Sequence, residues 1–311
     1  MTRGELKNLS ASVRERLANI TRARREDFGE VLSRYARERL LYRLSASDYK
    51  ERFILKGALL FSYWTGAPHR PTRDLDLLGR GESDIALLEK VFRDICQVEV
   101  EPDGLAFLKD SVRGERIKEE EEYEGVRLHM IAMLANARIP VQVDIGFGDA
   151  VVPAAEDISF PTLLEFPAPR LRSYRRETVV AEKFEAMVKL GILNSRMKDF
   201  YDVWQLSRQF DFDGSVLSRA IKATFERRGT PVPAETPLAL TPTFYEDSQK
   251  KAQWNGFLGK GRLDVAGKSL GEIAVSLREF IMPPATAVQQ GEEFDEMWDA
   301  GGPWRRTGEG Q

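Results

Sequence analysis

Cysteine and histidine are scarce in this chain of 311 residues, which has one cysteine, Cys96, and two histidines, His69 and His129. A single cysteine forms neither an internal disulfide nor a cysteine metal cluster, and two distant histidines are too few for a histidine metal site. His129, on an alternating strand pattern, is expected to be structural. Thiols without disulfide partners are typical of a reducing compartment, so we expect a cytoplasmic protein. Cys96 ends an amphipathic helical pattern and is expected to be a small buried apolar side chain.

Long apolar runs are also absent. No uninterrupted apolar stretch approaches the roughly 20 residues that a bilayer-spanning helix needs, so we expect no membrane partner. The first part of the chain includes Lys7, Arg14 and Arg16 and lacks the apolar segment of a secretory signal.

An excess of one charge is missing too, because the formal net charge is −3. This value argues against a uniformly basic nucleic-acid binder. The charge is nevertheless uneven: residues 1–52 and 169–230 each hold thirteen Lys and Arg against eight Asp and Glu, and residues 282–311 hold two against six. Two basic regions and an acidic tail are compatible with a polyanionic partner, although solvated helix faces and an ordinary tail would give the same counts.

Apolar periodicity predicts helices at the start of the chain and strands in its middle. Spacings of three and four residues predict two helices within residues 6–44, broken near residues 21–27. Another amphipathic helix is predicted over residues 84–96, followed by strands within residues 98–147.

One predicted hairpin contains an acidic run. We expect a strand to begin at Ile117 and to continue through the acidic residues 119–122. A turn over residues 123–125 would lead into the return strand. The acidic run is expected to be a solvated sheet edge, because charges on an edge prevent pairing between sheets.

The second half of the chain is predicted to be mainly helical. Prolines between residues 153 and 169 mark a loop-rich connection without regular structure. The helices that we expect after it span residues 177–193, 197–210, 216–228 and 270–280. From residue 283 the chain is rich in glycine, proline and acid. It is predicted to be either disordered or draped over the body through Trp298 and Trp304.

The stretch with the clearest chemistry runs from an apolar strand at residues 53–55 through Gly57 and a helix over 58–64 to a strand with Asp74 and Asp76. Residues two apart in a strand point to the same face, so the two carboxylates lie together while the leucines between them enter the core. Ionised carboxylates on one face are costly unless a cation lies between them, and oxygen ligands of this kind suit Mg²⁺.

A third carboxylate belongs to this pattern. Residues 139–149 alternate strictly, with Val141 and Val143 on one face and Gln142 and Asp144 on the other. Two-metal phosphoryl transfer needs about three carboxylates from neighbouring strands. The glycine turn would let a backbone approach a triphosphate and present helix N-terminal N–H groups to it.

These motifs resemble a known family. The stretch LKGALLFSYWTGAPHRPTRDLDLLG (55–79) resembles the core of the AbiEii/AbiGii-type nucleotidyltransferase toxins, which belong to the polymerase-β-like nucleotidyltransferase superfamily and are related to the MenT toxins. VQVDIGFGD (141–149) and ETVVAEKFEAMVKLGILNSRMKDFYDVWQL (177–206) resemble the other signatures of that family. The arginine-rich N-terminal helices and the closing GGPW (301–304) are similar to one branch of it.

The resemblance implies an α+β fold, with a polymerase-β-like mixed-sheet core, N-terminal helices and a helical C-terminal domain, and a nucleotide held between core and helical domain. The domains that we expect are an N-terminal helical segment over 1–50, the nucleotidyltransferase core over 51–165, the helical domain over 166–282 and an acidic Gly/Pro/Trp tail over 283–311.

The resemblance also implies roles for individual residues. Asp74 and Asp76 match the metal-binding pair, Asp144 matches the third carboxylate, Lys183 matches a phosphate-binding lysine, and Asp199 matches an essential aspartate. The nucleotide-binding set implied in this way comprises Lys56, Gly57, Ala58, Thr72, Lys183, Lys189, Arg196 and Lys198. Ala58 departs from the superfamily, in which a second Gly or a Ser is usual, so backbone rather than hydroxyl contacts to phosphate are expected there.

Plainer explanations stay open for several of these residues. Lys183 could be a surface lysine paired with Glu182 or Glu185. Asp199 and Asp202 could be helix-surface carboxylates that pair with nearby basic residues. Thr72 could be a simple loop hydroxyl, although its closeness to the predicted metal site makes self-modification conceivable.

The function implied by the resemblance is that of a toxin that transfers NMP from an NTP, with Mg²⁺ or Mn²⁺ as cofactor. The implied acceptor is RNA, particularly the tRNA 3′ end, which would block translation, and the implied partner is a cognate antitoxin. Basic residues at the N-terminus and in residues 170–176 are where we expect RNA backbone contacts. The alternatives are transfer to a small molecule or a protein, and a non-catalytic module that binds a nucleotide or a partner.

Overall fold

The computed structural model of the chain describes residues 3–66, 70–118 and 124–306. They form two compact units. The first unit comprises Met1–Gly148 and Glu156–Ser173, and the second comprises Asp149–Ala155 and Tyr174–Gln311. Among the described residues, no helix is long and apolar enough to cross a membrane.

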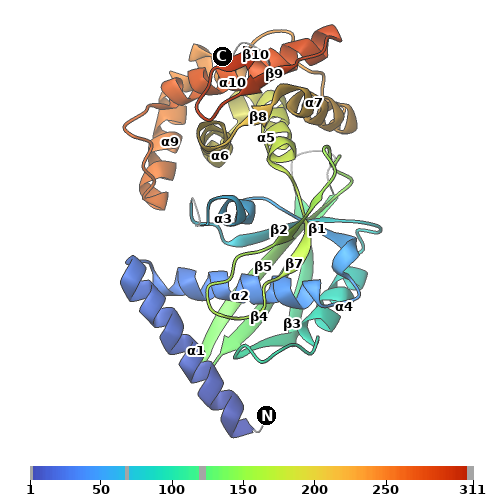
Figure 1. The fold of residues 1–311 in the computed structure, drawn as a ribbon, viewed down its shortest axis with the longest axis vertical. Coiled ribbons are helices and arrows are strands. Elements are labelled where there is room, and N and C mark those ends of the chain that lie inside the picture. Colours follow the sequence, from blue (N-terminus) through green and yellow to red (C-terminus); the bar gives the residue numbers. More distant parts are fainter. Residues whose placement is uncertain (1–2, 67–69, 119–123, 307–311) are drawn as a thin grey trace. The chain divides into compact units, whose positions relative to one another are not determined.

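The first unit contains a seven-stranded mixed sheet with helices (Figure 1). Its helices are α1 (Arg3–Arg24), α2 (Phe28–Ser45), α3 (Leu59–Thr65) and α4 (Ile85–Cys96), with a 3₁₀ turn η1 (Lys50–Arg52). Its strands are β1 (Phe53–Lys56), β2 (Asp74–Gly79), β3 (Leu105–Lys118), β4 (Glu124–Leu134), β5 (Ala137–Phe147), β6 (Glu156–Ser159) and β7 (Arg170–Ser173). The order is β3-β4-β5-β2-β1-β7-β6, with β2 parallel to β5 and β1 parallel to β7. The predicted α+β class with a mixed-sheet core is confirmed.

Alternation of apolar and polar residues gives this sheet a core face. In β5 the side chains of Val141, Val143 and Ile145 are buried, and the residues between them are only partly buried. Helix α4 packs on β3, where a Cβ added to Gly114 would lie 2.6 Å from Ile85 Cγ2. Glycine at this point lets the helix approach the strand closely.

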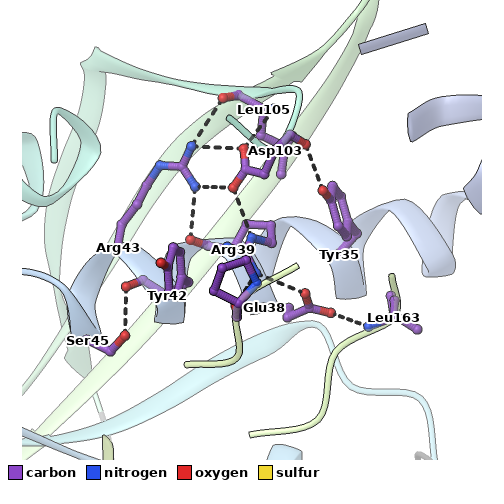
Figure 2. A network of polar contacts seen from close by, with 10 residues as sticks. Tyr35, Glu38, Arg39, Tyr42, Arg43, Ser45, Asp103, Leu105 and Leu163 are labelled. Carbon is purple, nitrogen blue, oxygen red and sulfur yellow. Dashed lines mark hydrogen bonds and ion pairs between the residues drawn. The ribbon is translucent and has the colours of Figure 1, made fainter. Parts of the chain in front are cut away.

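Two arginines of α2 surround one buried carboxylate, that of Asp103 (Figure 2). Arg39 donates Nε to Asp103 Oδ2 at 2.9 Å, and Arg43 donates Nη1 to Oδ2 at 2.7 Å and Nη2 to Oδ1 at 3.1 Å. Burial by itself would raise the pKa of Asp103, but the hydrogen bonds and charges of Arg43 and Arg39 hold it below its usual range. The Tyr35 hydroxyl also donates to the Asp103 carbonyl, at 2.7 Å.

The same helix is tied to the segment between β6 and β7. Glu38 Oε2 accepts a hydrogen bond from the Leu163 amide at 2.7 Å, and Arg39 Nη1 donates to the Pro167 carbonyl at 2.8 Å. Burial raises the pKa of Glu38 to about 7, although the Leu163 amide and the Arg39 guanidinium act in the opposite direction. Because Asp103 precedes β3 at one edge of the sheet and Leu163 precedes β7 near the other, α2 fastens both edges.

The second unit is mainly helical (Figure 1). Its helices are α5 (Arg176–Leu190), α6 (Met197–Gln209), α7 (Gly214–Arg228), α8 (Pro242–Tyr245), α9 (Ser248–Gly261) and α10 (Leu270–Gln290), with 3₁₀ turns η2 (Gly191–Leu193) and η3 (Leu238–Leu240). A small sheet in the order β10-β9-β8 is formed by β8 (Phe212–Asp213), β9 (Glu296–Trp298) and β10 (Trp304–Arg306).

The acidic tail drapes over this unit, as one of the two alternatives predicted. Helix α10 continues through Pro283 and Pro284, whereas the pattern predicted its end at Phe280. Pro284 has no N–H to donate to the carbonyl of Phe280, four residues earlier, and the Trp304 indole N–H donates to that carbonyl at 2.9 Å. Trp298 is buried and donates its indole N–H to the Ser207 carbonyl at 2.7 Å. For the described residues after Pro283, the disordered alternative is wrong.

The predicted hairpin differs from the observed one. Strand β3 begins at Leu105, so the prediction that a strand begins at Ile117 is wrong, and Ile117 is the next-to-last residue of β3. Gly125 lies within β4 rather than in a turn. A bulge in β3 interrupts its alternation and hides the strand from a pattern search. The acidic run 119–122 lies outside the described residues.

Several further elements were not predicted. The proline-rich connection, predicted to lack regular structure, contains β6 and leads into β7, which pairs in parallel with β1. Helix α9 has no predicted counterpart; its apolar residues are few, and only Lys250 and Trp254 of the helix are buried.

We predict that Asp103→Ala lowers the free energy of unfolding by about 3–5 kcal/mol, because it leaves the buried Arg43 guanidinium without its carboxylate partner and takes from Arg39 the nearer of its two. Urea denaturation of the purified protein measures this. Asp110→Ala, at an exposed side chain, is the control and should change stability by no more than about 0.5 kcal/mol. Equal losses for the two variants would contradict the role assigned to Asp103.

We also predict a pH-dependent difference between the wild-type protein and Glu38→Gln. The pKa of Glu38 is raised in the folded state from 4.5 to about 7, so the folded state keeps this proton longer and wild-type stability falls as pH rises through that window. The stability of Glu38→Gln relative to wild type should therefore rise by an amount on the order of 3 kcal/mol between about pH 4.5 and about pH 8. Urea denaturation at both pH values measures it, and a pH-independent difference would contradict the prediction.

Candidate active site

One face of the first unit's sheet carries a row of charged residues from five adjacent strands. Asp76 of β2 lies opposite Lys56 of β1 and opposite Asp144 of β5. Asp144 lies opposite Arg127 of β4, which in turn lies opposite Glu115 of β3. Side chains of residues paired in this way lie on the same face and interact. We call Lys56, Asp76, Asp144, Arg127 and Glu115 the charged row.

The predicted carboxylate pair is present on β2. Asp74 and Asp76 are partly buried, and Leu75 and Leu77 point into the core, where their side chains are fully buried. Asp74 lies opposite Gln142 of β5, two residues before Asp76 on the same face of β2. Mg²⁺ in proteins is commonly bound by one or two carboxylates together with water and substrate phosphates, so this oxygen pair fits such an ion.

Gly57 is required beside Asp76 for two reasons. Its φ of +76° lies in the left-handed region that side chains disfavour. A Cβ at this position would lie 2.0 Å from Asp76 Oδ2 and 2.6 Å from Asp76 Cγ. The glycine turn therefore makes room for the Asp76 carboxylate, a role that the sequence did not indicate. Ala58, which follows, is buried and precedes α3 without a side-chain cap.

Asp144 lies on the expected face but is engaged by an arginine. Arg127 Nε donates to Asp144 Oδ1 at 2.8 Å and Arg127 Nη2 donates to Oδ2 at 2.7 Å. Gln142 Nε2 adds a bond to Oδ1 at 3.1 Å. The hydrogen bonds that Arg127 donates to Asp144 raise the pKa of Arg127 above its usual range, against the effect of its partial burial. Sequence reasoning missed Arg127, because its role depends on the pairing of β4 with β5.

The structure thus brings the three predicted metal ligands to one face of the sheet. Asp74 and Asp76 share one face of β2. Asp144 lies opposite Asp76 on β5 and forms a bidentate ion pair with Arg127. Over residues 3–66, 70–118 and 124–306, no three His, Cys, Asp or Glu side chains are grouped so that they could hold a metal ion.

A second arginine near the carboxylate pair was also missed. Arg37 of α2 is buried and donates Nη1 to the carbonyl of Arg73 at 2.9 Å, directly before Asp74. Burial lowers the pKa of Arg37 to about 10, while the charges of Glu30 and Asp74 act in the opposite direction. The sequence held one sign of this role: Arg37 lies in the predicted helix among the apolar residues expected to be buried.

The second unit contains a separate cluster around Lys183 of α5. Its ammonium lies 2.5 Å from Asp199 Oδ1 and 2.9 Å from Asp202 Oδ2, both on α6. The side chains of Lys183, Asp199 and Asp202 are 15%, 6% and 0% exposed. The explanation of the two aspartates as surface carboxylates is therefore wrong, and Lys183 is not a surface lysine.

A neighbouring cluster surrounds Arg228 of α7. Its guanidinium is 3.0 Å from Asp149, 3.6 Å from Glu182 and 2.7 Å from Glu185. Burial by itself would lower the pKa of Arg228, but these three carboxylates raise it above its usual range. Through these contacts Arg228 joins α7 to α5 and to Asp149, in the segment Asp149–Ala155 of the same unit.

The remaining candidates lie outside these clusters, and most of them are exposed or partly buried. Lys189 and Lys198 are exposed, and Arg196 is partly buried just before α6. Thr72 lies in the loop before β2. His129 is exposed on β4 and lies 3.3 Å from Glu115. Cys96 is buried, as predicted, and burial raises its pKa to about 12; His69 lies outside the described residues.

Comparisons with known proteins show what the chain is similar to. A family model described as the nucleotidyl transferase AbiEii toxin of type IV toxin–antitoxin systems matches residues 39–276. Among solved structures, JHP933 from Helicobacter pylori is similar with 14% identity and a TM-score of 0.44, over 82% of this chain and 90% of that one. A candidate nucleotidyltransferase from H. pylori is similar with 15% identity and a TM-score of 0.47, over 85% of this chain and 98% of that one. The comparison with curated proteins found no match.

We predict that Gly57→Ala destabilises the protein more than Gly81→Ala does. Both glycines have positive φ, at +76° and +88°, but an added Cβ meets Asp76 at the first position and has nothing within 4 Å at the second. Gly81→Ala should cost about 1 kcal/mol for the backbone conformation, and Gly57→Ala about 1–3 kcal/mol more for the clash. Thermal and urea unfolding measure both, and equal losses would show that Asp76 does not lie against Gly57.

Proposed function

The chain belongs to the AbiEii family of nucleotidyltransferase toxins, and we propose on this premise that it transfers NMP from an NTP to an RNA acceptor. The observation that carries the proposal is the pair of carboxylates on one face of β2, inside the matched region and beside a glycine turn. In this reaction an acceptor hydroxyl attacks the α-phosphorus, the bond to the β-phosphate breaks, and pyrophosphate leaves.

In the first unit, Asp74 and Asp76 would hold a divalent cation, Mg²⁺ or Mn²⁺. When bound, such an ion neutralises the carboxylates and the charge that develops on the phosphates. Gly57 leaves the space that the Asp76 carboxylate occupies, and Arg37 holds the backbone just before Asp74. Lys56, Gly57, Ala58 and Thr72 remain the proposed nucleotide contacts of this unit, and the place of Lys56 opposite Asp76 supports its part.

In the second unit, Lys183 is the proposed phosphate-binding residue. A lysine binds phosphate as a compact point charge, and two buried carboxylates hold this ammonium in one position. Asp199 would thus be essential because it positions Lys183. Lys189, Arg196 and Lys198 are the further proposed contacts, and the exposure of both lysines makes them available to an anionic substrate.

The proposed acceptor is RNA, in particular the tRNA 3′ end, and its modification would block translation. Basic side chains support an RNA partner, since Arg14, Arg22 and Arg24 of α1 and Arg170 and Arg175 are exposed. The proposed protein partner is a cognate antitoxin, because the family is one of toxin–antitoxin systems. A cytoplasmic location is part of the proposal, which the single buried, unpaired thiol of Cys96 supports.

The test is incubation of the purified protein with labelled NTPs, Mg²⁺ and total tRNA. We expect label on RNA, and we expect Asp74→Ala and Lys183→Ala to lower the rate by at least about 10²-fold, because each removes a charge needed at the phosphates. Asp110→Ala and Lys222→Ala, at exposed side chains, are the matched controls and should keep full activity.

Each alternative gives a different result in the same assay. Label on a small molecule or on protein, with none on RNA, would replace the RNA acceptor. Nucleotide binding without any transfer would indicate a non-catalytic module. Transfer to RNA that survives both Asp74→Ala and Lys183→Ala would contradict the proposed site.

A further inference from the structure

Resting on the proposed function, we propose that Arg127 binds a phosphate group of the substrate and that Asp144 positions Arg127 instead of serving as a third metal ligand. Arg127 belongs to the charged row and lies on the same sheet face as Asp76. Neither the family resemblance nor the sequence pattern gave this arginine a role.

The Asp144 carboxylate has little capacity left for a metal ion. Each of its oxygens accepts a hydrogen bond from Arg127, at 2.8 and 2.7 Å. Gln142 Nε2 lies 3.1 Å from one oxygen and 3.4 Å from the other. A bidentate pair of this kind is strong and directional, so the carboxylate fixes the plane of the guanidinium.

The guanidinium, by contrast, has donors to spare. Arg127 uses Nε and Nη2 for Asp144, and in the described part of the chain its Nη1 has no hydrogen-bond partner. The Arg127 side chain is 33% exposed, against 16% for Asp144. A planar guanidinium that is held on one edge and open on another is suited to bind a phosphate oxygen.

Charge along the row explains why an arginine is needed there. Asp76 and Asp144 are directly opposite each other on neighbouring strands, and like charges in such positions repel. Arg127 neutralises Asp144 from the far side, so Asp144 does not need the charge of the cation proposed at Asp74 and Asp76. Two positive centres on one sheet face would then stabilise phosphate charge, which is the main requirement of this reaction class.

The phosphate could belong to the NTP or to the backbone of the RNA acceptor. Both present the same oxygen atoms to a guanidinium, and separate binding measurements distinguish them. Each is made without turnover: a non-hydrolysable NTP analogue in the absence of RNA, and tRNA in the absence of NTP.

The variants are Arg127→Met, Arg127→Lys and Asp144→Asn, with Arg93→Met as the matched control. Arg93 and Glu89 of α4 form an ion pair of similar exposure, 36% and 19%, outside the charged row. Circular dichroism and thermal unfolding verify that each variant is folded. Mn²⁺ affinity, measured by electron paramagnetic resonance without nucleotide, is compared with that of Asp76→Asn.

We expect Arg127→Met to weaken binding of the NTP analogue, of tRNA or of both by at least about tenfold, Arg127→Lys to recover part of the loss, and Arg93→Met to have no effect. A loss confined to one ligand identifies the source of the phosphate. We expect Asp144→Asn to leave Mn²⁺ affinity within about twofold, while Asp76→Asn lowers it at least tenfold.

Two outcomes would overturn this inference. One is unchanged binding of both ligands by Arg127→Met, which would make the ion pair purely structural. The other is a loss of Mn²⁺ affinity in Asp144→Asn as large as that in Asp76→Asn, which would make Asp144 a metal ligand. Because binding is measured without transfer, a protein that binds both ligands through Arg127 but never labels RNA would overturn the proposed function and leave this inference standing.

Discussion

The opposition of Asp76 and Asp144 on adjacent parallel strands is the constraint on which the candidate active site depends. Two carboxylates directly across a sheet repel each other unless positive charge is supplied. For Asp144 the fold supplies it through the bidentate contact with Arg127. Asp76 lies opposite Lys56 of β1, and Gly57, which has no side chain, leaves room for the Asp76 carboxylate.

The sheet that carries this face is held by charges buried on its other elements. Helix α2 contacts the chain before β3 through Asp103 and the chain before β7 through Glu38, so it joins the two edges of the sheet. Its Arg37 reaches the backbone directly before the β2 carboxylates. A helix with so many buried charged residues is costly to desolvate, and its stability depends on each partner being in place.

Much of this arrangement follows from sequence, because alternation in a strand is a local property. The pattern around Asp74 and around Asp144 indicated which face each carboxylate takes, and the structure agrees. Helical periodicity found α2, α4 and α5 to within a few residues. The stretches 55–79, 141–149 and 177–206 indicated the AbiEii family by their resemblance to its motifs, and the family model that matches residues 39–276 confirms it.

The sequence could not show how residues of neighbouring strands are paired, nor where a local rule of helix or strand formation fails. The pairing of Arg127 with Asp144 depends on a two-residue turn between Leu134 and Ala137, and nothing in the turn sequence marks it strongly. Pro284 reads as a helix end, yet the helix continues because Trp304 satisfies the carbonyl that proline leaves without a donor. Asp144 is brought to Arg127 by strand pairing, and Trp304 is distant from Phe280 along the chain, so neither contact can be read from the local sequence.

The most direct test of the account is the location of a bound cation. Anomalous diffraction from crystals grown with Mn²⁺ and a non-hydrolysable NTP analogue would locate the ion. The account predicts a manganese peak in contact with both Asp74 and Asp76, with the Arg127–Asp144 pair intact beside it. A peak coordinated by Asp144 with Arg127 displaced, or no peak at the β2 carboxylates, would contradict it.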